Sequence, residues 1–189
     1  MKSSVLRLMG RSNANGLMKN AYNDTIKIIL KETDKLSKAN ELNDKQAMHM
    51  RLLVEETICM LPEILQYGDG TFWIDNFYQK YEIHLRVRPN DVDSKVNGVV
   101  RSSDPFLKKG ILRRICAAFD RAVNEGRDKK GTMDNWSLLS YIDSVKQSGK
   151  NKNLDAWDEL EKSIIANLAD DVTVSTVDDE IEVVVIKEF

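Results

Sequence analysis

The chain has 189 residues, of which 42% are hydrophobic and 31% are charged, and its formal net charge at pH 7 is −2. This composition is ordinary for a folded globular protein and does not fit a disordered chain. A charge so close to zero provides no broad basic field, so we expect no binding to nucleic acid.

The N-terminal residues and the two cysteines predict a cytoplasmic protein. The opening MKSSVLRLMG has only a few apolar residues before Arg11, so it lacks the apolar core of a secretory signal peptide. No run approaches the roughly 20 apolar residues that span a bilayer. Cys59 and Cys116 both lie in apolar helical patterns, which favours buried free thiols over a disulfide or a metal pair. We therefore expect no membrane contact.

The chain opens with a predicted strand and a predicted helix. In residues 3–9, Leu6 and Leu8 fall on one side of an extended chain, which predicts a short strand with a buried leucine face. Residues 10–16 are expected to form a turn. Over residues 17–38, apolar side chains recur at three- and four-residue spacing opposite Lys and Glu, which predicts an amphipathic packing helix.

One long helix is predicted over residues 43–66. It begins at a capping box, in which Asn43 and Gln46 can bond each other reciprocally. Apolar residues recur along it and give a stripe that must face a core. Glu55 and Glu56 are adjacent, about 100° apart around the helix, so at least one carboxylate should lie at the edge of the stripe. A solvated salt bridge and a chemical role both remain open for that position.

A hairpin is predicted after this helix, with strands over residues 71–74 and 80–88 and Asp75-Asn76 between them. In the second strand polar residues alternate with apolar ones, which places His84 on a polar face exposed to solvent. No second His or Cys lies at metal-site spacing, so we expect no metal site.

Residues 89–104 are expected to form a solvated loop that includes Asp91. After this loop, Lys108, Lys109 and Gly110 lead into an amphipathic helix. Backbone N–H groups at a helix start favour anions, and two lysines would add to that field. A plain basic helix entry is the alternative.

The last third of the chain contains a predicted helical insertion and a closing hairpin. Residues 124–153 combine a charged loop with a short helix, and a partner-specific surface is expected there first. Asn153 can cap a further helix. The closing hairpin spans residues 171–186, and its second strand is an almost wholly apolar run, which is typical of a central strand covered on both faces.

The order of these elements predicts the fold class. A strand, two helices, a hairpin, three helices and a second hairpin indicate an α+β protein with a two-layer α/β sandwich. We expect helices on one face of a mostly antiparallel mixed sheet, in a single domain over residues 1–189 with an insertion at 124–153.

The segment LLVEETICML, which follows the capped helix start, resembles the N-box helix of the GHKL (histidine-kinase-like) ATPase superfamily, especially its small anti-sigma-factor members. The opening strand and helix and the closing strands are similar too. The resemblance implies that Glu56 is the catalytic residue, which orients the water that attacks the γ-phosphate of ATP. It also implies that Asp91 contacts adenine and that Lys108, Lys109 and Gly110 hold phosphate.

The chain departs from the family pattern at three places. The family's basic or aromatic residue further along the helix is missing, since Ile64 stands near its place and Pro62 interrupts the turn. Met60 stands where the family has an Asn that holds Mg²⁺, and a thioether does not replace an oxygen ligand for a hard cation. The only Gly-x-Gly, at residues 68–70, precedes the hairpin instead of following it.

The resemblance therefore implies a degenerate ATPase domain, similar to bacterial anti-sigma-type proteins. Such a domain would act as a cytoplasmic regulator of a protein partner and bind ATP with little or no hydrolysis. A homodimer is compatible with this expectation. The alternative is a non-enzymatic interaction or scaffold module with no nucleotide site.

Overall fold

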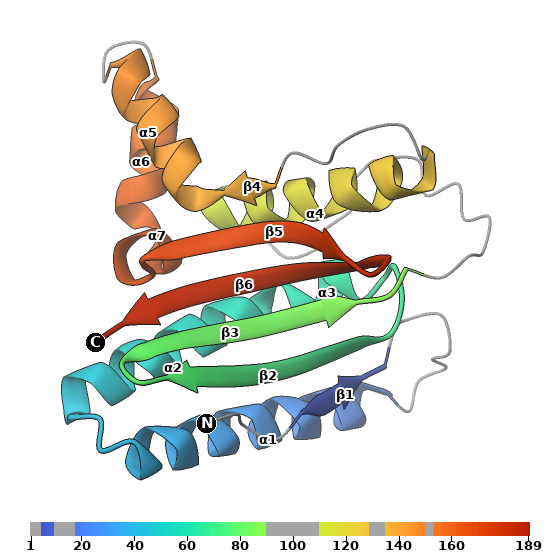
Figure 1. Cartoon of the computed structure of the whole chain (residues 1–189), viewed down its shortest axis with the longest axis vertical. Helices are drawn as coiled ribbons and strands as arrows, with labels where there is room; N and C mark the ends of the chain where they lie inside the picture. The colour runs from blue at the N-terminus through green and yellow to red at the C-terminus, as the bar shows by residue number, and fades with distance from the viewer. Residues whose placement is uncertain (1–4, 10–17, 90–109, 129–134, 150–152) are drawn as a thin grey trace.

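The computed structural model describes residues 5–9, 18–89, 110–128, 135–149 and 153–189 (Figure 1). The strands are β1 (Leu6–Leu8), β2 (Gly70–Phe77), β3 (Lys80–Val87), β4 (Trp136–Ser137), β5 (Asp171–Val177) and β6 (Glu180–Glu188). The helices are α1 (Met18–Ala39), α2 (Asp44–Cys59), α3 (Leu61–Ile64), α4 (Ile111–Asp128), α5 (Leu138–Ser148), α6 (Leu154–Lys162) and α7 (Ile164–Leu168).

The described strands form one six-stranded sheet in the order β1-β2-β3-β6-β5-β4, and each of these pairings is antiparallel. Helices α1 to α4 lie behind the sheet in Figure 1, in a second layer. The predicted α+β class and two-layer sandwich are therefore confirmed. The sheet that we expected to be mixed is antiparallel throughout its described part.

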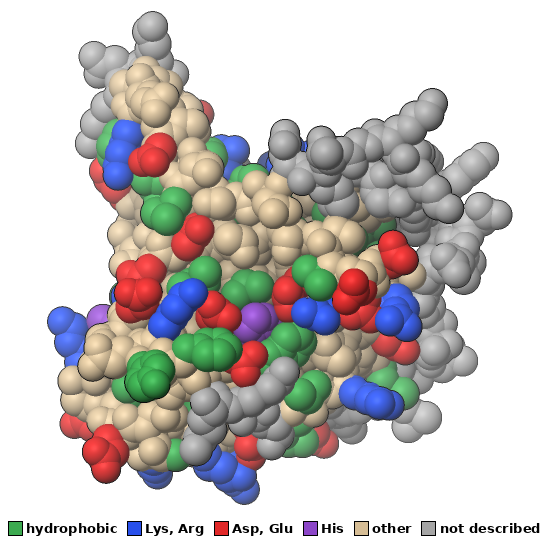
Figure 2. Space-filling model, in the orientation of Figure 1, with side chains coloured by type: hydrophobic (Ala, Val, Ile, Leu, Met, Phe, Trp, Pro, Cys, Tyr) green, Lys and Arg blue, Asp and Glu red, His purple; other side chains and the backbone are tan. Residues whose placement is uncertain are grey.

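The core lies between the sheet and the helix layer. Alternate residues of β3 point into it, and they are almost fully buried: Tyr81, Ile83, Leu85 and Val87. On β6, which lies between β3 and β5, Ile181, Val183 and Val185 do the same. The closing strand is therefore central, as expected. Its other face is not covered by a described helix, and Figure 2 shows the side chains on that face of the sheet.

The long helix predicted over residues 43–66 is interrupted. Its capping box is confirmed, because the backbone N–H of Gln46 donates to Asn43 and the backbone N–H of Asn43 donates to Gln46, each at 3.0 Å. However, α2 ends at Cys59, and α3 begins after Met60 with Pro62 in its first turn. Proline has no N–H to donate to the preceding turn, so the helix must restart at this point.

The first hairpin turns later than predicted. Asp75 and Asn76 belong to β2, where they pair with Glu82 and Tyr81. The turn lies at residues 78–79, where Tyr78 has a φ of 63°. Asn76 is only 7% exposed. Its polar side chain is therefore part of a buried region of β2 and does not indicate a turn.

Neither cysteine forms a disulfide. Cys116 is buried, as expected, but Cys59 is exposed, contrary to the prediction. Cys59 is the last residue of α2 and lies outside the buried stripe that includes Val54 and Ile58. Within the described ranges, no helix combines the length and the apolar content required to cross a bilayer.

Substitution of one buried and one exposed leucine tests this assignment of the core. Leu85 of β3 is fully buried, whereas Leu139 of α5 is 49% exposed. We expect Leu85→Ala to lower the free energy of unfolding by about 2–5 kcal/mol, because it removes buried atoms and leaves a cavity. Leu139→Ala should change it by less than about 0.5 kcal/mol. Urea denaturation of both variants measures this, and equal losses would contradict the assignment of the core.

Candidate functional site

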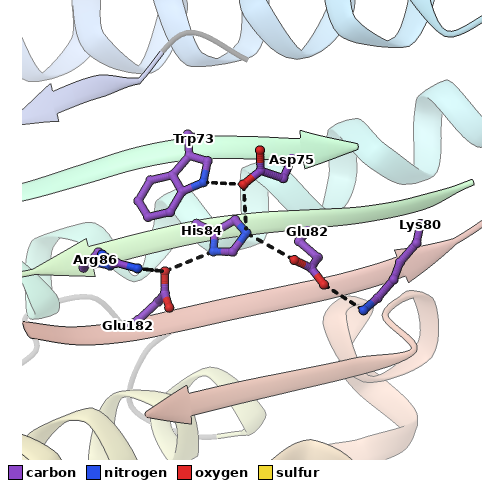
Figure 3. A network of polar contacts seen from close by, with 7 residues as sticks. All are labelled: Trp73, Asp75, Lys80, Glu82, His84, Arg86 and Glu182. Carbon is purple, nitrogen blue, oxygen red and sulfur yellow. Dashed lines mark hydrogen bonds and ion pairs between the residues drawn. The ribbon is translucent and has the colours of Figure 1, made fainter. Parts of the chain in front are cut away.

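Polar side chains gather on the face of the sheet that is turned away from the helix layer (Figure 3). They form a connected group across β2, β3 and β6, which we call the sheet-face network: Trp73, Asp75, Lys80, Glu82, His84, Arg86 and Glu182. Strand register brings them together, because side chains alternate between the two faces of a strand. His84 lies opposite Trp73 on β2, and Arg86 lies opposite Glu182 on β6.

His84 is at the centre of the network. Its Nδ1 lies 3.0 Å from Glu182 Oε1, and its Nε2 lies 3.5 Å from Glu82 Oε2 and 3.6 Å from Asp75 Oδ2. The imidazole stacks on the Trp73 ring, with 4.5 Å between centroids and 4° between planes.

The prediction that His84 is exposed to solvent is wrong, since the residue is only 9% exposed. The alternation of β3 correctly placed it on the polar face. What covers it comes from neighbouring strands, because Trp73 on β2 and Glu182 on β6 flank it. Cross-strand neighbours of this kind depend on which strands pair, and β6 is about 100 residues away along the chain.

Glu182 is the most deeply buried carboxylate of the network, at 6% exposure. It accepts hydrogen bonds from Arg86 Nη2 at 3.0 Å and from Arg86 Nε at 3.3 Å. Burial disfavours its ionised form, but the hydrogen bonds and charges of His84 and Arg86 outweigh burial, so the pKa of Glu182 lies below its ordinary value. Sequence reasoning missed this residue. The sequence does contain a signal for it, because Glu182 is the single charged residue in the otherwise apolar run of residues 181–186.

The rest of the network is also paired. Trp73 Nε1 donates to Asp75 Oδ2 at 2.8 Å, and Lys80 Nζ lies 2.7 Å from Glu82 Oε1. The Arg86 guanidinium lies 5.2 Å from the centroid of the Trp73 ring, within range of a cation–π contact. The arrangement therefore joins three strands through charge pairs. Across the described ranges, no group of three His, Cys, Asp or Glu side chains is arranged to hold a metal ion.

Glu56, the predicted catalytic residue, lies half-buried on α2. Burial, and secondarily the charge of Glu55, raises the pKa of Glu56 above its ordinary value. Glu55 has different surroundings, because its carboxylate accepts from Arg51 Nε at 3.0 Å, and Arg51 also binds Asp34 of α1. The two adjacent carboxylates therefore differ: one forms the salt bridge expected at the helix edge, and the other lies in a less polar setting.

The predicted phosphate-binding residues are described only in part. Gly110 precedes α4 with a φ of 91°, and a Cβ added there would meet no atom within 4 Å. Asp91, Lys108 and Lys109 lie outside the described residues. Helix α2 packs chiefly on α1 and α7, whereas α4 packs chiefly on β5 and β6, so Glu56 and Gly110 come from elements with different neighbours.

Met60, which stands where the resemblance would place an Mg²⁺ ligand, is fully buried in the core. A side chain with 0% exposure cannot reach a nucleotide-bound ion unless the break between α2 and α3 opens. The thioether also has the wrong chemistry for Mg²⁺.

A half-buried polar contact joins α4 to the segment that follows α3. Tyr67 Oη donates to Asp120 at 2.7 Å, and burial, followed by this bond, raises the pKa of Tyr67. Burial, with a smaller effect of the Glu63 charge, raises the pKa of Cys116 to about 12. At neutral pH the Cys116 thiol is therefore protonated and a poor nucleophile.

The Glu182 carboxylate gives a test of the network. We expect Glu182→Gln to lower the free energy of unfolding at pH 7 by about 1–3 kcal/mol, because it weakens buried charge-assisted hydrogen bonds. The lowered pKa of Glu182 means that this difference is present above about pH 4.3, the ordinary glutamate value. It should shrink as the pH falls through the lower pKa of the folded protein.

Urea denaturation between about pH 3 and pH 7 measures this difference. Glu188→Gln is the matched control, since Glu188 is an exposed residue of the same strand. A wild-type protein no more stable than Glu182→Gln at pH 7 would show that the network adds nothing to stability.

Comparison of the sequence with known proteins found no matching protein-family model and no matching curated protein.

Proposed function

We propose that the chain is a regulatory protein-binding module of the cytoplasm, and that it contacts its partner through the hairpin of α5 and α6. The observation that carries this proposal is the position of that hairpin, which projects away from the sheet (Figure 1). It presents two exposed leucines, with Leu139 at 49% and Leu154 at 60% exposure. Exposed apolar side chains on a projecting element suit a partner with an apolar surface.

The base of the hairpin is firmly attached to the body. The backbone N–H of Leu139 donates to Asp171 Oδ1 at 3.1 Å, and Ser137 Oγ caps α5 by accepting from the backbone N–H of Ser140. The bond to Asp171 joins the start of α5 to the first residue of β5.

Arg114 of α4 holds both helices of the hairpin. Its Nε donates to Glu159 of α6 at 2.7 Å, and its guanidinium lies 4.5 Å from the centroid of the Tyr141 ring of α5. A hairpin held at several points loses less conformational freedom on binding, which favours affinity.

A second candidate function is nucleotide binding without efficient hydrolysis, on a histidine-kinase-like scaffold. Two observations favour it. The capped helix α2 follows a strand and a helix, as the resemblance requires, and Glu56 lies half-buried on it with a raised pKa. A nucleotide bound near α2 would then regulate the module, with Mg-ATP as the ligand and Glu56 beside its phosphates.

The partner surface can be tested with paired substitutions. We expect Leu139→Asp with Leu154→Asp to weaken partner binding at least tenfold, because charges replace two exposed apolar side chains of the hairpin. The partner would be identified by crosslinking to the wild-type chain, purified, and titrated by calorimetry. Ile28→Asp is the control, since Ile28 is 48% exposed on α1. Equal affinity of the double variant and the wild type would overturn this assignment.

The nucleotide candidate can be tested by melting temperature. A ligand that binds only the folded protein stabilises it by mass action, by about 2.7 kcal/mol at 100 times its Kd. We expect millimolar Mg-ATP to raise the melting temperature, with phosphate release near background. Glu56→Gln should keep the shift and lose any residual release, while Glu55→Gln should change neither. An unchanged melting temperature would remove the nucleotide function and leave the partner surface untouched.

A further inference from the structure

A pocket lies where α3 and the segment after it meet α4, and we call it the α3–α4 pocket. It has about 180 Å³ of empty space, part of which is open to solvent. Six residues line it: Glu63, Ile64, Gln66, Tyr67, Cys116 and Phe119. The pocket therefore shares no residue with the sheet-face network or with the α5–α6 hairpin.

Glu63 is the residue of this pocket that the rest of the fold does not account for. It belongs to α3 and is only 7% exposed. Within the described part of the chain, its carboxylate pairs with no cation and accepts no hydrogen bond. Burial of a carboxylate without a partner is costly, because the carboxylate loses hydration and gains nothing in return. A ligand that brings a positive charge to Glu63 would offset this cost.

The groups beside Glu63 also favour a positively charged ligand. Burial is the main cause of the raised pKa of Tyr67, and its bond to Asp120 and the charges of Asp120 and Glu63 add to it. Burial likewise raises the pKa of Cys116, with a further contribution from the Glu63 charge. The negative charge of Glu63 therefore acts on both of these neighbours, which stay protonated and neutral at pH 7.

Hydrogen-bond donors are what this pocket lacks. Tyr67 Oη donates its proton to Asp120 at 2.7 Å, so toward any other group it can only accept. The ionised Glu63 carboxylate also only accepts. An ammonium group carries three N–H donors and no acceptor, so it complements both side chains.

Two aromatic rings form the apolar part of the pocket. The centroids of Tyr67 and Phe119 lie 5.8 Å apart, and the ring planes are tilted by 38°. The face of an aromatic ring attracts a cation that lies within about 6 Å of its centroid. The methylene stem of a long cationic chain also packs well on apolar side chains, here Ile64 and Phe119.

The pocket is too narrow in this structure to hold a water molecule, so entry of a ligand requires one side chain to move. Gln66 is suited to that movement. It is half-buried, and its amide forms no hydrogen bond with the part of the chain that the structure describes. A change of rotamer at Gln66 therefore breaks no such contact.

We propose that the α3–α4 pocket binds a primary ammonium group on a short apolar chain, the chemistry of a lysine side chain. Glu63 accepts from the ammonium, and the rings of Tyr67 and Phe119 contact its positive charge and its stem. A metal ion is less suitable, because no three His, Cys, Asp or Glu side chains among the described residues are placed to hold one. This site does not depend on the function proposed for the α5–α6 hairpin.

Titration of the full-length chain with n-butylammonium chloride tests the site, because this ligand is a lysine side chain without its backbone. Amide NMR signals report binding at constant ionic strength. We expect saturable shifts at residues 63–67 and 116–120, with a Kd in the millimolar range because so small a ligand makes few contacts. The neutral ligand 1-butanol has the same length, and it should bind at least tenfold more weakly. Absence of saturable shifts at these residues, or equal affinity for both ligands, would overturn the proposal.

Glu63→Gln separates the charge of the site from its shape. We expect it to weaken n-butylammonium binding at least tenfold and to leave 1-butanol binding unchanged. Glu188→Gln is the matched control, since Glu188 is an exposed carboxylate of β6, and it should keep the wild-type affinity. Unchanged n-butylammonium affinity in Glu63→Gln would refute the assignment. If Glu63→Gln does not fold, the comparison of the two ligands on the wild-type protein decides.

Discussion

The pairing of β3 with β6 at the centre of the sheet is the constraint on which the rest of the structure depends. On the helix side, Ile83 lies opposite Val185 and Leu85 lies opposite Val183, and all four side chains are fully buried. This pairing joins the middle of the chain to its end. It also fixes the helix layer, because α2 and α4 both pack against β6.

The same pairing produces the sheet-face network. Because side chains alternate along a strand, burying one set of residues against the helices turns the other set to the opposite face. That set includes His84 and Arg86 of β3 and Glu182 of β6, and the register places them in contact. A one-residue slip would move these charges into the core, so the charge pairs and the apolar core specify one register. The network therefore also contributes to the specificity of the fold.

Sequence patterns predicted the features that depend on neighbours along the chain. The reciprocal bonds of Asn43 and Gln46 and the buried side of β3 follow from local spacing, and both agree with the structure. The α+β class followed from the order of such elements. Turn chemistry was less reliable, since Asn76 resembled a turn residue but is buried in β2.

Features that depend on distant contacts were not predicted. His84 was predicted to be exposed, but residues of β2 and β6 cover it. Glu182 was not predicted to be a site residue, because its partners lie on β3, far away along the chain. Of the residues suggested by the resemblance, Glu56 is half-buried with a raised pKa, whereas Met60 is part of the core. Local spacing cannot show which carboxylate will be desolvated by tertiary packing.

The structure combines a sheet-and-helix body with one projecting element, the α5–α6 hairpin. The sheet and its network form the body, and Arg114 and Asp171 attach the α5–α6 hairpin to it. The hairpin is attached to β5, which pairs with β6, and β6 in turn pairs with β3. The contact between His84 and Glu182 joins β3 to β6, so it is the most direct point at which to test this pairing. A double-mutant cycle with His84→Gln and Glu182→Gln at pH 6.5 measures their coupling in urea denaturation. We expect a coupling of about 1.5–3 kcal/mol, as for a buried hydrogen bond to a charged group; additive effects, within about 0.5 kcal/mol, would contradict it.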